Sequence, residues 1–217
     1  MKLKKPIQNI MIIGDSYSTF AGYIPEGHAA YYSTNEKPET DVRRVEETWW
    51  HSLCSDMGLH LVLNESWSGT TLCNTGYDGD CSQTSSFIYR LEKLAAEGFF
   101  EKNDIDTVFV FGCTNDSWAN SPLGEIKLCD HTKEDLLSVC PAIGYFVGKL
   151  KALLPDGNIV FIINTNIKSE IKEAIKAVSD HNGTAYVALS RIDKLCGHPT
   201  VKGMSEIKEQ VKAALLS

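Results

Sequence analysis

The sequence has no long apolar run and no excess of basic residues. None of its apolar runs approaches the length of a membrane-spanning helix. Its 21 lysines and arginines are outnumbered by 28 aspartates and glutamates, which gives a formal net charge of −7. Nucleic acids and anionic membrane surfaces bind to basic patches, so we expect neither as a main partner, and we expect no membrane insertion.

Regularly spaced cysteines are also missing. The chain has seven cysteines, an odd number, and they are scattered with no C-x-x-C pair among them. A zinc ribbon or a secreted domain held by disulfides would show a regular spacing. We therefore expect reduced thiols in a reducing compartment, with a Cys73–Cys81 bridge that closes a small loop as the open alternative.

The amino terminus has the basic residues of a signal peptide but lacks its apolar segment. Residues 1–6 include three lysines, and the apolar stretch that follows is short and ends in Gly-Asp-Ser. We therefore expect a soluble, cytoplasmic protein. Secretion of a chain whose signal peptide has been removed is the alternative.

No linker, low-complexity tract or internal repeat divides the chain, so we expect a single domain over residues 1–217. The composition, 43% hydrophobic and 23% charged, is typical of a globular protein with one sizeable core. One long irregular segment, residues 17–45, follows Ser16 directly. An irregular segment of this length is usually functional, which favours a lid or a substrate loop, and a packed surface loop is the alternative.

Short apolar runs alternate with helical patterns along the chain. This alternation predicts an α/β fold with a five-stranded parallel sheet and helices on both faces. Pro141 lies inside the third helical pattern and predicts a break or kink there. The expected strands are 10–13, 59–64, 105–111, 158–164 and 184–189, and the expected helices are 46–57, 87–97, 133–154, 168–181 and 201–216.

Polar residues follow four of the five expected strands. Ser16 comes after the first strand, Gly69 after the second, Asn115 after the third and His198 after the fifth. The carboxyl ends of parallel strands lie along one edge of a sheet, where α/β proteins bind their ligands. We therefore expect these four residues to lie close together.

These residue types are the ones that acyl transfer by a serine requires. The reaction needs a hydroxyl, a base for its proton, and donors aimed at the developing oxyanion. Ser16 supplies the hydroxyl and a backbone N–H, and His198 can be the base. Gly69 offers an unobstructed backbone N–H, and Asn115 offers a side-chain amide. Each residue alone is a weak signal, but their coincidence at four strand ends points to nucleophilic catalysis.

The order of these blocks resembles the SGNH (GDSL-type) hydrolase superfamily over nearly the whole chain. Gly14-Asp15-Ser16 is similar to its nucleophile block, and Gly69, within Trp67-Ser68-Gly69, to its glycine block. Residues 112–116 are similar to its Gly-x-Asn-Asp block with one extra residue, and His198-Pro199 to its histidine block.

The resemblance implies a flavodoxin-like, three-layer α/β/α fold. It also implies hydrolysis of an ester or thioester through an acyl-enzyme on Ser16. The oxyanion hole would consist of Ser16, Gly69 and Asn115, with no metal and no other cofactor.

The sequence departs from that family at the acid that orients the histidine. The family usually has an acidic residue three positions before the histidine, where this chain has Leu195. We expect Asp193 to complete the triad from two positions further back. The alternative is a Ser–His dyad in which a backbone carbonyl orients His198. For Asp15 we expect a structural role, hydrogen-bonding the loops that carry Gly69 and Asn115.

The expected substrate is a small ester. Aromatic rings with polar neighbours suit a sugar face or a short acyl chain, and no long apolar stretch suggests a lipid tunnel. We therefore expect an esterase that releases a small acyl group such as acetyl, from a carbohydrate. The alternatives are a lysophospholipase or thioesterase, and a non-catalytic carbohydrate- or nucleotide-binding module; no residue pattern signals an oligomeric state. The expected pocket residues are Tyr17, Trp67, Asn74 and Trp118, with an aromatic loop at Tyr23, Tyr31 and Tyr32.

Overall fold

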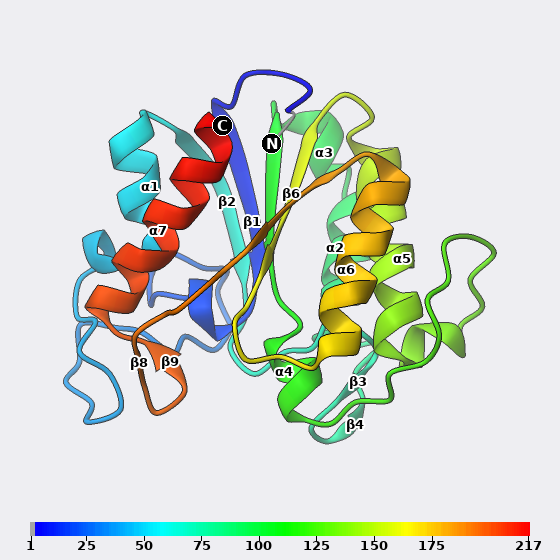
Figure 1. Cartoon of the computed structure of the whole chain (residues 1–217), viewed down its shortest axis with the longest axis horizontal. Helices are drawn as coiled ribbons and strands as arrows, with labels where there is room; N and C mark the ends of the chain where they lie inside the picture. The colour runs from blue at the N-terminus through cyan, green and yellow to red at the C-terminus, as the bar shows by residue number, and fades with distance from the viewer. Residues whose placement is uncertain (1–2) are drawn as a thin grey trace.

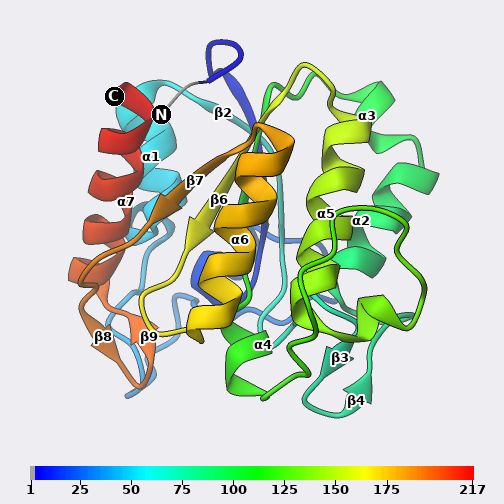
Figure 2. The ribbon, with the colours of Figure 1, turned by 45° about the vertical axis from the view of Figure 1, so that its right-hand side comes forward.

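The computed structural model describes residues 3–217 and contains a central five-stranded parallel sheet. The strand order is β2 (His60–Ser66), β1 (Asn9–Gly14), β5 (Thr107–Phe111), β6 (Asn158–Ile163) and β7 (Ala185–Ala188). Helices cover both faces, so the predicted three-layer α/β/α fold is confirmed (Figures 1 and 2). The chain winds from β1 to β2 on one side and then to β5 on the other. Ligands in such sheets bind beyond the strands at this switch point, next to β1 and β5.

Each face of the sheet has its own hydrophobic core. Ile10 and Ile12 face α1 (Trp49–Met57) and α7 (Val201–Leu216), whereas Met11 and Ile13 pack in the core on the opposite face. This alternation is what a strand buried on both faces requires. The helices of the opposite face are α2 (Phe87–Ala96), α3 (Phe99–Lys102), α5 (Val139–Leu153) and α6 (Ser169–Asn182).

The predicted break or kink at Pro141 is displaced, because the expected helix is broken at Ser138 and α5 runs through Pro141 without interruption. A short 3₁₀ turn, η3 (Asp135–Leu137), comes first, and α5 then starts at Val139. Pro141 therefore lies in the first turn of the helix, where a backbone N–H has no partner within the helix. The expected helix 133–154 is thus two elements, and the proline stands near the start of the second.

Several short elements escaped the sequence patterns. Two small hairpins are present, β3 (Thr75–Gly76) with β4 (Gly79–Asp80), and β8 (Lys194–Leu195) with β9 (His198–Pro199). The turns η1 (Ser16–Ser18), η2 (Val45–Glu47) and the helix α4 (Thr114–Trp118) are also short. Elements of two to five residues carry too little periodicity to predict.

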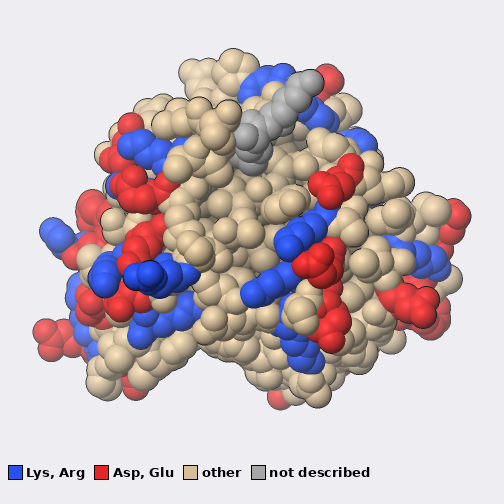
Figure 3. All heavy atoms as spheres, viewed as in Figure 1, with Lys and Arg blue, Asp and Glu red and all other residues tan. Residues whose placement is uncertain are grey.

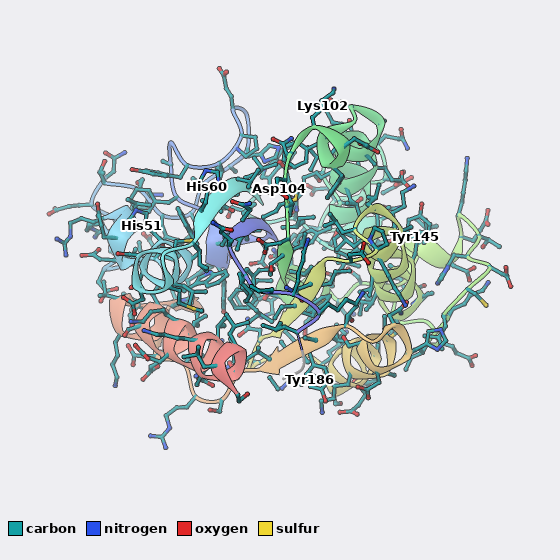
Figure 4. All side chains as sticks on the ribbon, turned by 90° about the horizontal axis from the view of Figure 1, so that it is seen from above. His51, His60, Lys102, Asp104, Tyr145 and Tyr186 are labelled. Carbon is teal, nitrogen blue, oxygen red and sulfur yellow. The ribbon has the colours of Figure 1, made fainter. Side chains whose placement is uncertain are left out.

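The opposite edge of the sheet, where the strands begin, lies far from α4 and the β8–β9 hairpin. Figure 4 looks onto this edge, with His60 at the start of β2 and Asp104 just before β5. The Asp104 carboxylate accepts a hydrogen bond from the Asn9 side chain there, at 3.0 Å. In Figure 1, by contrast, α4 and the hairpin lie together below the sheet, at the carboxyl ends of the strands.

A buried arginine ties the carboxyl ends of β1 and β2 together. The Arg90 guanidinium donates to the backbone oxygens of Glu65, at 2.6 Å, and Gly14, at 3.2 Å. It also donates to the Thr70 hydroxyl, at 3.2 Å. Burial lowers the pKa of Arg90 to about 10, so the side chain keeps its charge at neutral pH. The Glu65 carboxylate, 3.7 Å away, compensates that charge.

The seven cysteines are all free, so the alternative of a Cys73–Cys81 bridge is not present. The Cys81 sulfur instead lies 3.4 Å from the Thr71 hydroxyl. Within residues 3–217, no helix combines the length and apolar character needed to cross a bilayer.

Candidate active site

Ser16 and His198 meet although 182 residues separate them. Ser16 opens η1 directly after β1, and the Asp15 carboxylate caps this turn by accepting from the Tyr17 N–H at 3.0 Å. The β8–β9 hairpin follows β7, at the edge of the sheet, and carries His198 back to β1. The His198 Nε2 lies 2.9 Å from the Ser16 Oγ, which is hydrogen-bond distance for a base and its nucleophile.

The second ring nitrogen of His198 faces a backbone carbonyl. Its Nδ1 lies 3.2 Å from the oxygen of Cys196. A carbonyl can only accept, so Nδ1 carries the hydrogen in this arrangement and Nε2 presents its lone pair to Ser16. This is the tautomer that a general base requires.

Asp193 does not reach His198, which corrects the expected triad. Its carboxylate accepts from the hydroxyl of Thr200, the residue that caps α7. The cause is the hairpin, whose turn residues Cys196 and Gly197 have φ of 49° and 81°. Two positive φ values between paired strands are typical of a tight type I′ turn. The turn places Asp193 and Thr200 together at the base of the hairpin, and His198 near its tip.

Burial sets the proton affinity of His198. Burial lowers its pKa below the ordinary 6.5, and the nearby charge of Lys194 lowers it further, while the Cys196 carbonyl opposes both effects. Lys194 is held by the Asn164 and Thr165 side chains, at 3.2 and 2.9 Å. His198 is therefore neutral at pH 7 and available as a base.

The expected oxyanion donors Gly69 and Asn115 follow β2 and β5, the two strands that neighbour β1. Gly14, at the end of β1, pairs with Ser66 of β2 on one side and Phe111 of β5 on the other. Gly69 follows β2 with φ of +81°, and no atom lies within 4 Å of the position of a side-chain carbon there. This conformation favours glycine, and the space beside it is open.

The Asn115 amide is held at both ends. Its nitrogen donates to the Thr70 carbonyl at 3.0 Å, and its oxygen accepts from the Tyr77 hydroxyl at 3.1 Å. The amide nitrogen carries two hydrogens, and only one of them has a partner among the described residues. Tyr77, on the β3–β4 hairpin, was missed by sequence reasoning because its short hairpin has no periodic pattern.

Asp116, rather than Asp15, fixes the loop that follows Gly69. Its carboxylate accepts from the N–H groups of Leu72, at 2.9 Å, and Cys73, at 3.0 Å. Asp15 instead caps its own turn, and burial raises its pKa to about 7 against the opposing hydrogen bond from the Tyr17 N–H. Its predicted structural role therefore applies to η1, whereas the contact to the loop after Gly69 belongs to Asp116.

The expected pocket residues lie in different places. Trp118 is 41% exposed, and its ring makes a T-shaped contact with His198, with the ring centroids 5.7 Å apart. Trp67 stacks on His28 and lines a cavity of about 470 Å³ that contains neither Ser16 nor His198. Tyr17 and Asn74 are buried, which corrects their expected contact with substrate. Tyr17 donates to the Gly197 carbonyl, and Asn74 accepts from the Ser86 hydroxyl at the start of α2.

The surface is hollowed beside these residues. In Figure 3 the lower outline of the molecule is indented between the β8–β9 hairpin and α4, and few acidic or basic atoms line the indentation. A separate small cavity of about 170 Å³ lies beside Gly69 and Tyr77, and neither Ser16 nor His198 lines it. Within residues 3–217, no three His, Cys, Asp or Glu side chains cluster as a metal site would need.

Comparisons with known proteins find one matching family and similar crystal structures. A family model described as GDSL-like lipase/acylhydrolase matches residues 8–215. A crystal structure of a protein described as a GDSL-like lipase, from Bacteroides ovatus, is 39% identical with a TM-score of 0.89, and the match covers 98% of this chain and 99% of that one. A similar protein from Bacteroides uniformis is also 39% identical, with a TM-score of 0.88 and coverage of 97% and 96%. A search of curated proteins finds no match.

More distant structures share the fold. An acetyl xylan esterase from Butyrivibrio proteoclasticus is 15% identical with a TM-score of 0.62, and the match covers 97% of this chain and 64% of that chain. At this level of identity the likeness shows the architecture alone.

The environment of His198 leads to a prediction for its titration. NMR of the ring signals should give a pKa below 6.5, because burial and the charge of Lys194 both disfavour the imidazolium. The Lys194→Gln substitution removes the charge and should raise that pKa. A value above 6.5 in the unaltered protein, or no response to the substitution, would contradict this description of the site.

Proposed function

The chain belongs to the GDSL-like lipase/acylhydrolase family, and from that premise we propose that it is a serine esterase with Ser16 as its nucleophile. The observation that carries the proposal is the 2.9 Å contact between the Ser16 hydroxyl and His198 Nε2. A serine hydroxyl is a weak nucleophile until a base within hydrogen-bond distance takes its proton. Its position beyond β1, at the switch point of the sheet, also supports the assignment.

The acylation step uses both partners. His198 takes the proton from Ser16 while the serine oxygen attacks the ester carbonyl. The resulting oxyanion accepts hydrogen bonds from the N–H groups of Ser16 and Gly69 and from the free amide hydrogen of Asn115. Collapse of this intermediate expels the alcohol, which takes the proton back from His198 and leaves the acyl group on Ser16.

Deacylation repeats the step with water. His198 accepts a proton from water as its oxygen attacks the acyl carbonyl. The same donors hold the second oxyanion, and Ser16 leaves with the proton from His198 as the acid is released. The Cys196 carbonyl accepts the Nδ1 hydrogen throughout, so we propose a Ser–His dyad in which a backbone dipole orients the base.

A small acyl group on a carbohydrate is the substrate that the surroundings support best. The cavity beside Gly69 is small, about 170 Å³, and its lining is mostly glycine, threonine and aspartate, without Ser16 or His198, so it offers polar surface next to the reacting groups and no acyl tunnel. A lysophospholipase would need a long apolar channel instead. Tyr77 and Trp118 are 54% and 41% exposed, and exposed aromatic rings suit the apolar faces of sugars. An acetyl xylan esterase of the same fold shows that the architecture accommodates such a substrate in that protein.

Hydrolysis of p-nitrophenyl acetate, butyrate and octanoate tests the proposal. We expect turnover that is fastest on the short chains and that falls by about a thousand-fold or more in Ser16→Ala, because the nucleophile is lost. Ser205→Ala, which alters an exposed serine of α7, is the matched control and should retain the rate. Equal rates for the unaltered protein and Ser16→Ala would exclude this serine as the nucleophile.

The dyad has a separate test in Asp193→Asn. Removing the carboxylate of a catalytic triad costs about 10⁴-fold in turnover. Asp193 binds Thr200 rather than His198, and asparagine can still accept that hydrogen bond. We therefore expect kcat/KM within about threefold of its value in the unaltered enzyme. A substitution away from the reacting groups typically has only a small effect of this kind. A folded variant that has lost most of its activity would instead support a triad.

A further inference from the structure

The irregular segment 17–45 forms hydrogen bonds to the β8–β9 hairpin, which carries His198. The Tyr17 hydroxyl donates to the Gly197 carbonyl at 2.6 Å, and the Tyr32 hydroxyl donates to the Pro199 carbonyl at 3.0 Å. The carbonyls on both sides of His198 are thus bound by tyrosines from one segment. Further along, the Asp41 carboxylate accepts from the N–H of Val201, at the start of α7.

One tyrosine of the same segment lies flat against the imidazole. The rings of Tyr31 and His198 are stacked with centroids 3.6 Å apart and planes 11° from parallel. Tyr17 and Trp118 also contact the imidazole, but their centroids are 5.5 and 5.7 Å away and their planes are tilted by 53° and 81°. Of these three rings, only Tyr31 lies parallel to the imidazole, with its π face against the face of that ring.

Tyr31 is itself held in place by its own segment. Its N–H donates to the Thr19 hydroxyl at 2.9 Å, and its carbonyl accepts from Lys37 at 3.0 Å. Its hydroxyl donates to the Glu39 carbonyl at 3.1 Å. The ring is therefore fixed before any substrate arrives, and the stack is a built feature rather than a chance contact of a mobile side chain.

Within residues 3–217, the groups around His198 include no negative charge that could stabilise its protonated form. The groups that face the imidazole are Ser16, Tyr17, Tyr31, Trp118, Lys194 and the Cys196 carbonyl, and of these only Lys194 is charged. No carboxylate among the described residues forms an ion pair with His198. When the imidazole takes the Ser16 proton it becomes a cation, half-buried, without an anionic partner and near a lysine.

We propose that Tyr31 is a positioning residue that holds the His198 ring and stabilises its protonated form through the stacked π face, in place of the absent acid. The negative face of an aromatic ring attracts a cation within about 6 Å of its centroid. The proton moves from Ser16 Oγ to Nε2, the electron pair stays on the serine oxygen, and the positive charge spreads over the ring that Tyr31 covers. This inference rests on the proposed function of Ser16 and His198.

The same contacts indicate that segment 17–45 holds the β8–β9 hairpin in place rather than opening as a lid. If the segment opened as a lid, it would break the hydrogen bonds to the carbonyls of Gly197 and Pro199 and uncover His198. The base would then be free to leave Ser16. The segment is therefore expected to stay closed through turnover, with substrate entering on the side of Tyr77 and Trp118.

The test compares Tyr31→Leu with Tyr31→Phe on p-nitrophenyl acetate. Leucine keeps an apolar cover over the imidazole but removes the π face, so kcat/KM should fall about 2- to 30-fold. Phenylalanine keeps the face and loses only the hydroxyl, so it should restore most of the rate. Tyr186→Leu changes a half-buried tyrosine of β7 that belongs to neither the catalytic residues nor the expected pocket, and it is the matched control.

A titration separates this role from a merely structural one. NMR should show a lower His198 pKa in Tyr31→Leu than in the unaltered protein, with Tyr31→Phe unchanged, and the acidic limb of the kcat/KM profile should move to lower pH in the same variant. Equal titrations for the leucine variant and the unaltered protein, or an equal loss of rate in the two variants, would overturn the proposal. If Ser16→Ala left ester hydrolysis intact, the proposed function would fail, and the titration would still decide the stacking.

Discussion

The buried guanidinium of Arg90 is the constraint on which the arrangement of the site depends. It binds the carbonyls of Gly14 and Glu65, which end the two strands that carry Ser16 and the Gly69 loop, and it binds the hydroxyl of Thr70 within that loop. Thr70 in turn accepts from the amide of Asn115. One side chain therefore connects the nucleophile turn, the glycine loop and the amide. A charged group this deeply buried is stable only while its hydrogen bonds are made, which fixes these loops relative to one another.

His198 reaches Ser16 from the hairpin that follows β7, the strand at the edge of the sheet. Other interactions than those of Arg90 hold it there. The β8–β9 hairpin is only two residue pairs long, too short to hold a catalytic geometry by itself. Tyrosine hydroxyls bind its carbonyls, and a stacked ring covers the imidazole. Dipoles and a π face stabilise an imidazolium less than a carboxylate does. In exchange, neutral groups leave the pKa of His198 low, so the imidazole is unprotonated at neutral pH and ready to act as a base.

Much of this could be predicted from the sequence because it depends on local pattern. The five strands of the sheet contain apolar runs, and Ser16, Gly69, Asn115 and His198 follow four of them in order. The membership in the family and the three-layer fold are confirmed. The spacing of residues along the chain led to a wrong prediction where a backbone turn decides which side chains meet. Asp193 lies close to His198 in sequence, but a tight turn at Cys196 and Gly197 sends its carboxylate to Thr200. Tyr17 and Asn74 are residue types that often line pockets. In the structure both are buried and form hydrogen bonds to other segments of the chain.

The central claim is that Ser16 is the activated nucleophile of this chain. A fluorophosphonate probe, followed by mass spectrometry of the peptides, tests it most directly, because the reagent reacts with an activated serine and remains attached. We expect one modified residue, Ser16, with labelling abolished by Ser16→Ala. Modification at any other residue, or undiminished labelling of the alanine variant, would contradict it.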